Sequence, residues 1–152
     1  MRKQIFIAVC DALKQIDNGQ AIKHIDLWNR NVEFIEQETP FSFPAVFIEF
    51  DAIQREYRND GVYKSRPTIK LHVVSQWEGS AADGSAYQGM ALEVFDLIDK
   101  ITVALTGLRG KGFHNMELVT SITNHNHEDI LENVECFQCI TLNDVVKESN
   151  KN

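Results

Sequence analysis

Near the N-terminus, apolar residues recur at the spacing of a helix that has one buried face. These positions are Ile5, Val9, Ala12, Leu13 and Ile16. The polar residues between them point to other sides of the same helix. Asn18-Gly19 follows directly, and because both residue types accept left-handed backbone angles, the pair predicts the end of this helix.

A longer apolar stripe at helical spacing lies in the second half of the chain. It consists of Tyr87, Met90, Ala91, Val94, Ile98, Ile101 and Leu105. Ser85 and Gln88 have the spacing of a capping box, which predicts a helix start near Ser85, and Thr106-Gly107 predicts its end. We expect this helix to pack on a sheet through Val94, Ile98 and Ile101.

Alternating or β-rich segments predict the strands. Residues 22–34 alternate in part and predict a first strand, whereas AVFIEFDAI and TIKLHVV flank the turn residues Asn59-Asp60-Gly61 and predict a hairpin. In that hairpin two sets of residues would share a buried face: Val46, Ile48 and Phe50 with Ile69, Leu71 and Val73. MELVTSIT and NVECFQCITL predict two further strands.

The resulting order, α-β-β-β-α-β-β, predicts an α+β fold. Two helices would cover one face of a mainly antiparallel sheet. No repeat or linker interrupts the chain, so we expect a single domain over residues 1–146 and a frayed tail over 147–152. With 152 residues and 43% hydrophobic content, such a domain can form a core without a metal or a disulfide.

Charge and cysteine content limit the classes of function. The formal net charge is −7 with a pI of about 5.2, and no run of basic residues is present. These features argue against sequence-specific nucleic acid binding. The apolar N-terminal residues are interrupted by Asp11 and Lys14, so neither a signal peptide nor a membrane span is expected. Three cysteines indicate reduced thiols and an intracellular protein.

One segment, NHNHEDILENVECFQC, concentrates residue types that bind transition metals. Cys136 and Cys139 lie in a predicted strand, where a separation of three places their sulfur atoms on opposite faces. His125 and His127 could share a face with Asp129, but they lie in a polar connection between strands. We therefore interpret the two cysteines as small buried apolar residues of a strand and the histidines as part of a solvated turn, and we expect no metal and no cofactor.

The other polar residues do not form a recognisable catalytic group. His72 alternates with Lys70 and Val74 in a strand, which favours a sheet-face histidine over a general base. Asp96 and Asp99 fall on the polar side of the long helix. We therefore expect a protein that is not an enzyme.

Several segments of the sequence, in their order along the chain, resemble those of a known protein family. They are FPAVFIEF, TIKLHVV, ALEVFDLIDKITVALTGLRG and the closing CITLND. This succession is similar to the tail terminator and tail-completion proteins of long-tailed bacteriophages and prophages. The resemblance implies a structural protein that forms a ring, commonly of six subunits, on the tail tube. It would stop tube polymerisation and form part of the head–tail joint.

The resemblance also implies partners and a location. The partners would be further copies of the chain, the tail tube protein and a head-completion protein. The protein would be present in the host cytoplasm during assembly and then in the virion tail.

Four aromatic residues beside predicted loops are candidates for these contacts. Tyr57 and Tyr63 flank the hairpin turn, and Trp77 and Tyr87 flank the loop before the long helix. Isolated aromatic residues among polar ones are typical of protein interfaces, although the same residues could instead cap the core. Two other functions remain open: an oligomeric ligand-binding module with a groove between sheet and helices, and a metal-dependent hydrolase that uses His125, His127 and Asp129.

Overall fold

The computed structural model describes residues 1–30, 41–76, 81–124 and 130–145, the last four of them as backbone only. The elements, in chain order, are α1 (Arg2–Lys14), a 3-10 helix η1 (Ile16–Gly19), β1 (His24–Leu27), β2 (Ala45–Asn59), β3 (Val62–Gln76), α2 (Gln88–Leu105), β4 (Phe113–Asn124) and β5 (Ile130–Val145). The predicted order α-β-β-β-α-β-β and the α+β class are confirmed.

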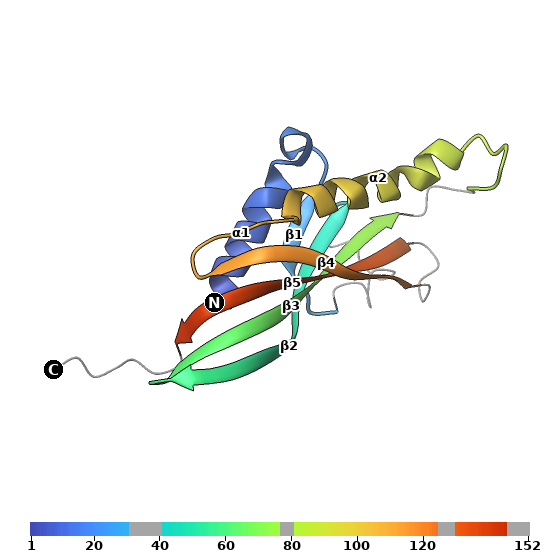
Figure 1. Cartoon of the computed structure of the whole chain (residues 1–152). Coiled ribbons are helices and arrows are strands. Elements are labelled where there is room, and N and C mark those ends of the chain that lie inside the picture. The colour runs from blue at the N-terminus through green and yellow to red at the C-terminus, as the bar shows by residue number, and fades with distance from the viewer. Residues whose placement is uncertain (31–40, 77–80, 125–129, 146–152) are drawn as a thin grey trace.

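The strands form one 5-stranded sheet in the order β1-β2-β3-β5-β4. The pair β1–β2 is parallel, and the remaining neighbours are antiparallel. Both α-helices lie on the same face of this sheet (Figure 1). The opposite face carries a smaller apolar cluster around Phe41, Phe47 and Ile130.

The hairpin between β2 and β3 has the predicted register. Val46 is paired with Val73, Ile48 with Leu71 and Phe50 with Ile69, and all six side chains contribute to the core beneath the helices. At the turn, Asp60 and Gly61 have φ angles of 50° and 76°. Two consecutive positive φ values match the right-handed twist of the flanking strands, which explains why this dipeptide closes the hairpin.

Each of the two helices contributes a row of buried apolar side chains to the main core. From α1 these residues are Ile5, Val9 and Leu13, and from α2 they are Val94, Leu97, Ile101 and Leu105. They contact Ile69, Leu71 and Phe137 on the central strands, among others. Side chains of this size each contribute about 1.5–3 kcal/mol when fully buried, so this layer holds the helices on the sheet.

Two details of α2 differ from the prediction. The helix begins at Gln88, with Tyr87 as its N-cap, and the predicted capping box is wrong. Ser85 Oγ accepts a hydrogen bond from the Tyr87 amide at 3.2 Å, and the Gln88 amide side chain donates to the Ala81 carbonyl. Ser85 therefore stabilises the turn before the helix and not the helix end itself.

Val94 and Ile101 of the predicted apolar stripe are buried in the core, as expected. Ile98 is less deeply buried than predicted. Leu97 is buried at 8% exposure, whereas Ile98 packs at the margin of the core. Positions 97 and 98 both lie near the buried side of a helix with 3.6 residues per turn, so the sequence pattern alone does not separate them. None of the described helices is long and apolar enough to span a lipid bilayer.

Candidate functional site

The outer half of the β2–β3 hairpin extends past the two helices (Figure 1). We call residues 53–67 the hairpin arm. Side chains 54–60 of this arm are all exposed. Such an arm buries little apolar surface of its own, so it is available for contacts with other molecules.

Tyr57 and Tyr63 face each other across the hairpin arm. Their rings are in an edge contact with centroids 5.2 Å apart and an interplanar angle of 65°. Tyr57 is 59% exposed, and its hydroxyl lies 3.5 Å from the Gly61 amide. Neither ring belongs to a core cluster, so the tyrosines form a small aromatic surface at the tip of the arm.

The structure separates the predicted interface residues into different regions. Tyr87 is 57% exposed and is the N-cap of α2. The first turn of α2 lies at the end of the molecule away from the hairpin arm (Figure 1). Trp77 lies outside the described residues. The aromatic residues therefore do not form one site, and a contact at Tyr57 would involve a different neighbour from a contact at Tyr87.

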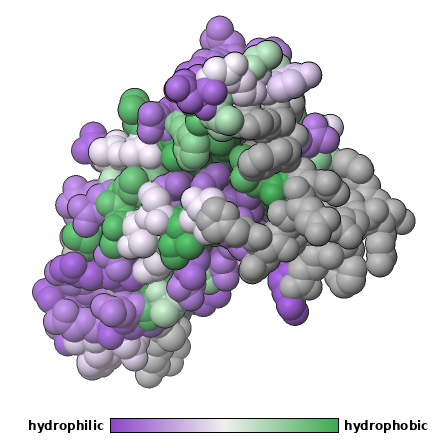
Figure 2. Space-filling view, turned by 90° about the vertical axis from the view of Figure 1, so that its right-hand side faces the viewer, coloured by the Kyte–Doolittle hydropathy of each residue, from purple (hydrophilic) through white to green (hydrophobic). Residues whose placement is uncertain are grey.

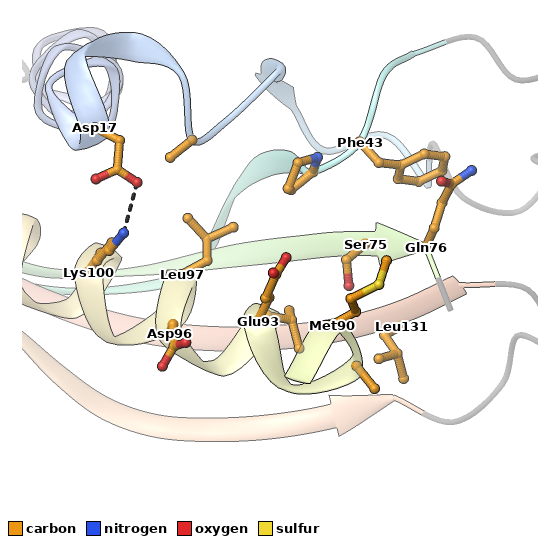
Figure 3. A pocket seen from close by; sticks show the side chains of 14 residues that line it. Asp17, Phe43, Ser75, Gln76, Met90, Glu93, Asp96, Leu97, Lys100 and Leu131 are labelled. Atoms are coloured by element: carbon orange, nitrogen blue, oxygen red, sulfur yellow. Dashed lines mark hydrogen bonds and ion pairs between the residues drawn. The ribbon is translucent and has the colours of Figure 1, made fainter. Parts of the chain in front are cut away.

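A groove lies between α2 and the adjoining end of the sheet. The alternative interpretation of the chain as a ligand-binding module requires a groove in this position. It has a volume of about 450 Å³ and includes apolar side chains from Phe43, Met90 and Leu131 (Figure 3). Seen from the side on which α2 begins, hydrophobic residues occupy the middle of the molecule, with hydrophilic residues above and below them (Figure 2).

Polar groups also line this groove. Lys100 donates a hydrogen bond to Asp17 at 2.8 Å at one end, and the Ser75 hydroxyl oxygen is buried near the other. Among the described residues Ser75 Oγ has no hydrogen-bond partner. A buried hydroxyl without a partner is unfavourable, so this atom would gain from a polar group placed in the groove.

A buried cluster of ionisable side chains that the sequence did not indicate lies on the sheet face opposite the helices. His72 on β3 is 6% exposed, and its Nδ1 is 2.8 Å from a Glu132 carboxylate oxygen on β5. Its Nε2 is 2.7 Å from Glu49 on β2. The ring of Trp28, just after β1, stacks on the imidazole with centroids 3.7 Å apart and an interplanar angle of 1°. Side chains from four parts of the chain thus meet at one histidine.

This geometry decides what His72 can do. Both ring contacts are hydrogen bonds at the same time only when the imidazole carries both protons or one carboxyl is protonated. Because both nitrogens are engaged and one ring face is covered, no nitrogen is left to accept a proton from a substrate. The prediction of a sheet-face histidine is confirmed, and its role is to link β2, β3, β5 and the chain after β1.

The two cysteines of the segment NHNHEDILENVECFQC lie on opposite faces of the sheet, as predicted. Cys139 packs with Phe137 in the core beneath the helices, whereas Cys136 faces the other side, where Lys70 is its pairing neighbour. Burial raises the pKa of the Cys139 thiol to about 12. A buried thiol of this kind is a poor nucleophile and a poor metal ligand.

The other candidate ligands cannot be placed. His125, His127 and Asp129 lie outside the described residues. In the described part of the chain, no group of three histidine, cysteine or acidic residues is arranged to hold a metal ion. Asp96 and Asp99 are exposed on α2, in agreement with their assignment to a solvated helix face.

Comparison with known proteins identifies a shared fold and no family. No family profile matches the chain, and no curated protein sequence is significantly similar to it. A solved structure described as "Virion of native gene transfer agent (GTA) particle" contains a chain with a similar fold, at a TM-score of 0.52. The similarity covers 93% of this chain and 96% of that chain, with 12% sequence identity. The class defined here is therefore an α+β fold that is also present in a component of that virion.

Proposed function

We propose that this chain is a structural protein of a phage-like virion. The observation that carries the proposal is the match with a chain of the gene transfer agent virion, because it covers 93% of one chain and 96% of the other. Such reciprocal coverage means that the shared fold accounts for nearly the whole of both chains. The resemblance of the sequence phrases to tail terminators supports the same class of protein independently.

Within that class we assign the chain the role of a tail terminator. It would cap the last layer of the tail tube, stop polymerisation and form part of the head–tail joint, as a ring of identical copies. Its partners would be the tail tube protein and a head-completion protein. It would act in the host cytoplasm during assembly and remain in the virion tail.

The distribution of exposed aromatic residues supports a protein with more than one neighbour. Tyr57 and Tyr63 form a surface at the tip of the hairpin arm, and Tyr87 is exposed at the far end of the molecule. A protein that joins two larger assemblies needs separate contact surfaces of this kind. We assign the hairpin arm and the region of Trp77 and Tyr87 to such contacts.

Complementation of a phage that lacks the gene tests this proposal. A variant with Tyr57→Ala and Tyr63→Ala is expected to yield filled heads and overlong, unjoined tails, with a melting temperature close to that of the original protein. The matched control, Tyr57→Phe with Tyr63→Phe, keeps both rings and is expected to complement. Normal virions from the double alanine variant would remove the hairpin arm from the proposal.

The groove beside α2 keeps a ligand-binding module as the second candidate. The observation in its favour is the buried Ser75 hydroxyl, which has no partner among the described residues. Met90→Trp would place a large side chain at the groove and is expected to leave tail assembly unchanged if the chain is a tail terminator. Loss of assembly with an unchanged melting temperature would favour an essential role for the groove.

A further inference from the structure

The outer side of α2 carries apolar side chains that the core does not use. Leu92, Phe95 and Val103 are 40%, 51% and 78% exposed, and none of them belongs to a core cluster. Their spacing places them on the side of the helix away from the buried residues Val94 and Ile101. The outer side of a surface helix is ordinarily polar, so a row of exposed apolar residues there indicates a contact with another molecule.

Carboxylates lie beside this apolar row. Glu93, Asp96 and Asp99 are exposed on α2. The helix carries one basic residue, Lys100, which donates a hydrogen bond to Asp17 on η1 and is therefore already paired. The outer side of α2 thus combines apolar side chains with an excess of negative charge. This combination favours a partner that offers aromatic side chains and positive charge.

The hairpin arm has this complementary charge. Residues 53–67 contain four basic and two acidic residues, in a chain whose net charge is −7. The basic residues are Arg55, Arg58, Lys64 and Arg66, and the acidic ones are Glu56 and Asp60. Asp144 of β5, which is opposite Tyr63, adds a third acidic residue at this end, where the four basic residues remain in excess. The excess is a sum over all charged residues, so ion pairs within the arm do not change it.

The two tyrosine rings lie within this positive region. Tyr57 is 59% exposed, and its ring is in edge contact with that of Tyr63. Neighbouring strands lie about 4.8 Å apart, so charges on both faces of the arm fall within the distance of about 10 Å over which exposed charges interact in dilute salt. Tyrosine and arginine are enriched at the centres of protein interfaces. The arm therefore offers what the outer side of α2 favours.

We propose that the hairpin arm of one copy packs against the outer side of α2 in the next copy, an inference that rests on the ring assembly proposed above. The arm and the first turn of α2 lie at opposite ends of the molecule, so the two surfaces cannot meet within one chain (Figure 1). The rings of Tyr57 and Tyr63 contact Leu92 and Phe95 of the neighbour, and the basic residues of the arm lie beside its carboxylates. Such a head-to-tail contact closes into a ring when the rotation per subunit fits a whole number of copies.

Self-complementary contacts are the alternative for each surface. Two α2 helices packed together would bring Asp96 and Asp99 of one copy near those of the other, and two arms would bring their basic residues together. Like charges across an interface are unfavourable, whereas the contact between arm and helix places opposite charges side by side. The charge distribution therefore favours the head-to-tail arrangement.

A photoreactive aromatic residue on α2 identifies its neighbour directly. Phe95→p-benzoylphenylalanine keeps an aromatic side chain at an exposed position and, on irradiation, bonds to the group that lies next to it. Mixed isotope-labelled and unlabelled copies are irradiated as concentrated purified protein and in cells that assemble the particle, and mass spectrometry identifies the linked peptides. Ile7→p-benzoylphenylalanine, at a position 47% exposed on α1, is the matched control and is expected to give no link to the arm.

The proposal predicts links from position 95 to residues 53–67 of another copy in at least one of the two preparations. Links from position 95 to α2 of another copy would show a self-complementary contact and overturn the proposal. Links to a different protein alone, or the absence of any link in both preparations, would overturn it as well.

Reversal of charge on each surface provides a second test. Asp96→Lys with Asp99→Lys, and in a separate protein Arg58→Glu with Lys64→Glu, are each expected to lower the yield of complete virions in complementation by roughly tenfold or more. Melting temperatures should stay nearly unchanged, because surface substitutions of this kind have small effects on stability. Supplying both variants together should restore the yield, because each reversed surface then meets an oppositely charged one in alternating copies.

A control variant and two outcomes separate this contact from the role of the protein. Asp11→Lys with Glu117→Lys makes the same change in net charge at exposed positions outside both surfaces and is expected to assemble normally. If both reversed variants terminate tails normally, or if their combination stays inactive, the contact between arm and helix is wrong and the tail-terminator role stands. Normal tails in the absence of the protein would refute the role itself.

Discussion

The His72 cluster leads to a prediction whose size follows from burial. In His72→Ala, the Glu132 carboxylate, whose side chain is 3% exposed, loses its imidazole partner and keeps the Asn124 amide at 3.1 Å. Removing one partner of a buried ion pair costs about 3–5 kcal/mol. Glu49, at 32% exposure, regains water and adds little. The stack on Trp28 contributes about 0.5–1.5 kcal/mol more. The surviving hydrogen bond from Asn124 offsets a loss of about the size of the stacking contribution, so we expect about 3–5 kcal/mol in total.

Denaturant unfolding of four proteins measures this cost: the original chain, His72→Ala, Glu132→Gln and the double variant. For a domain of this size the expected loss corresponds to a decrease in melting temperature of roughly 6–20 °C. In the double variant no uncompensated charge remains at position 132. The decrease in its free energy of unfolding is therefore expected to be smaller, by about 1 kcal/mol or more, than the sum of the decreases in the two single variants. A His72→Ala variant within about 0.5 kcal/mol of the original, or strict additivity, would refute a buried ion pair that holds the strands together.

Further predictions concern the core, a thiol and an exposed ion pair. Ile101→Ala should lower the free energy of unfolding by about 2–5 kcal/mol, whereas Val103→Ala, on the solvent side of α2, should change it by less than about 0.5 kcal/mol; equal effects in denaturant titrations would contradict the helix orientation. Because burial raises the pKa of Cys139 to about 12, iodoacetamide at pH 8 should label this thiol only after unfolding, and mass spectrometry should find it unmodified in the native protein. The hydrogen bond from Lys70 lowers the pKa of Asp51 from 3.8. The contribution of this ion pair to the free energy of unfolding is therefore fully present above pH 3.8 and is lost as the pH falls through the lowered pKa. With side chains 47% and 30% exposed, the difference in unfolding free energy between the original chain and Asp51→Asn should stay below about 1 kcal/mol at pH 7 and vanish in acid.

The parts of the fold that the sequence predicted depend on local signals. The turn residues Asp60-Gly61 determine the hairpin, and the hairpin determines which of its residues share a face, so Ile48 and Leu71 could be paired from sequence. The alternation of side chains in β5 likewise placed Cys136 and Cys139 on opposite faces. In these cases the partners are close in sequence, or only one strand is involved.

The His72 cluster depends on pairings between distant segments. The hairpin register brings Glu49 near His72, but the contact with Glu132 requires the register of β3 against β5, 60 residues away. Trp28 joins them only because β1 lies parallel beside β2. No local pattern in the sequence carries this information.

Helix boundaries depend on the loop geometry as well as on residue types. Ser85 and Gln88 have capping-box spacing, yet the turn that ends at Tyr87 moves the helix start to Gln88. Among the aromatic residues beside predicted loops, Tyr57 and Tyr87 are 59% and 57% exposed. Their separation at opposite ends of the molecule follows from the tertiary arrangement and not from the sequence.

The length of tails made without this protein tests the central claim most directly. Electron microscopy of lysates from a phage that lacks the gene would give the distribution of tail lengths, with and without the gene supplied in trans. A tail terminator predicts overlong tails of variable length and separate filled heads, both restored to normal virions by complementation. Tails of normal, uniform length joined to heads in the complete absence of the protein would contradict the proposed function.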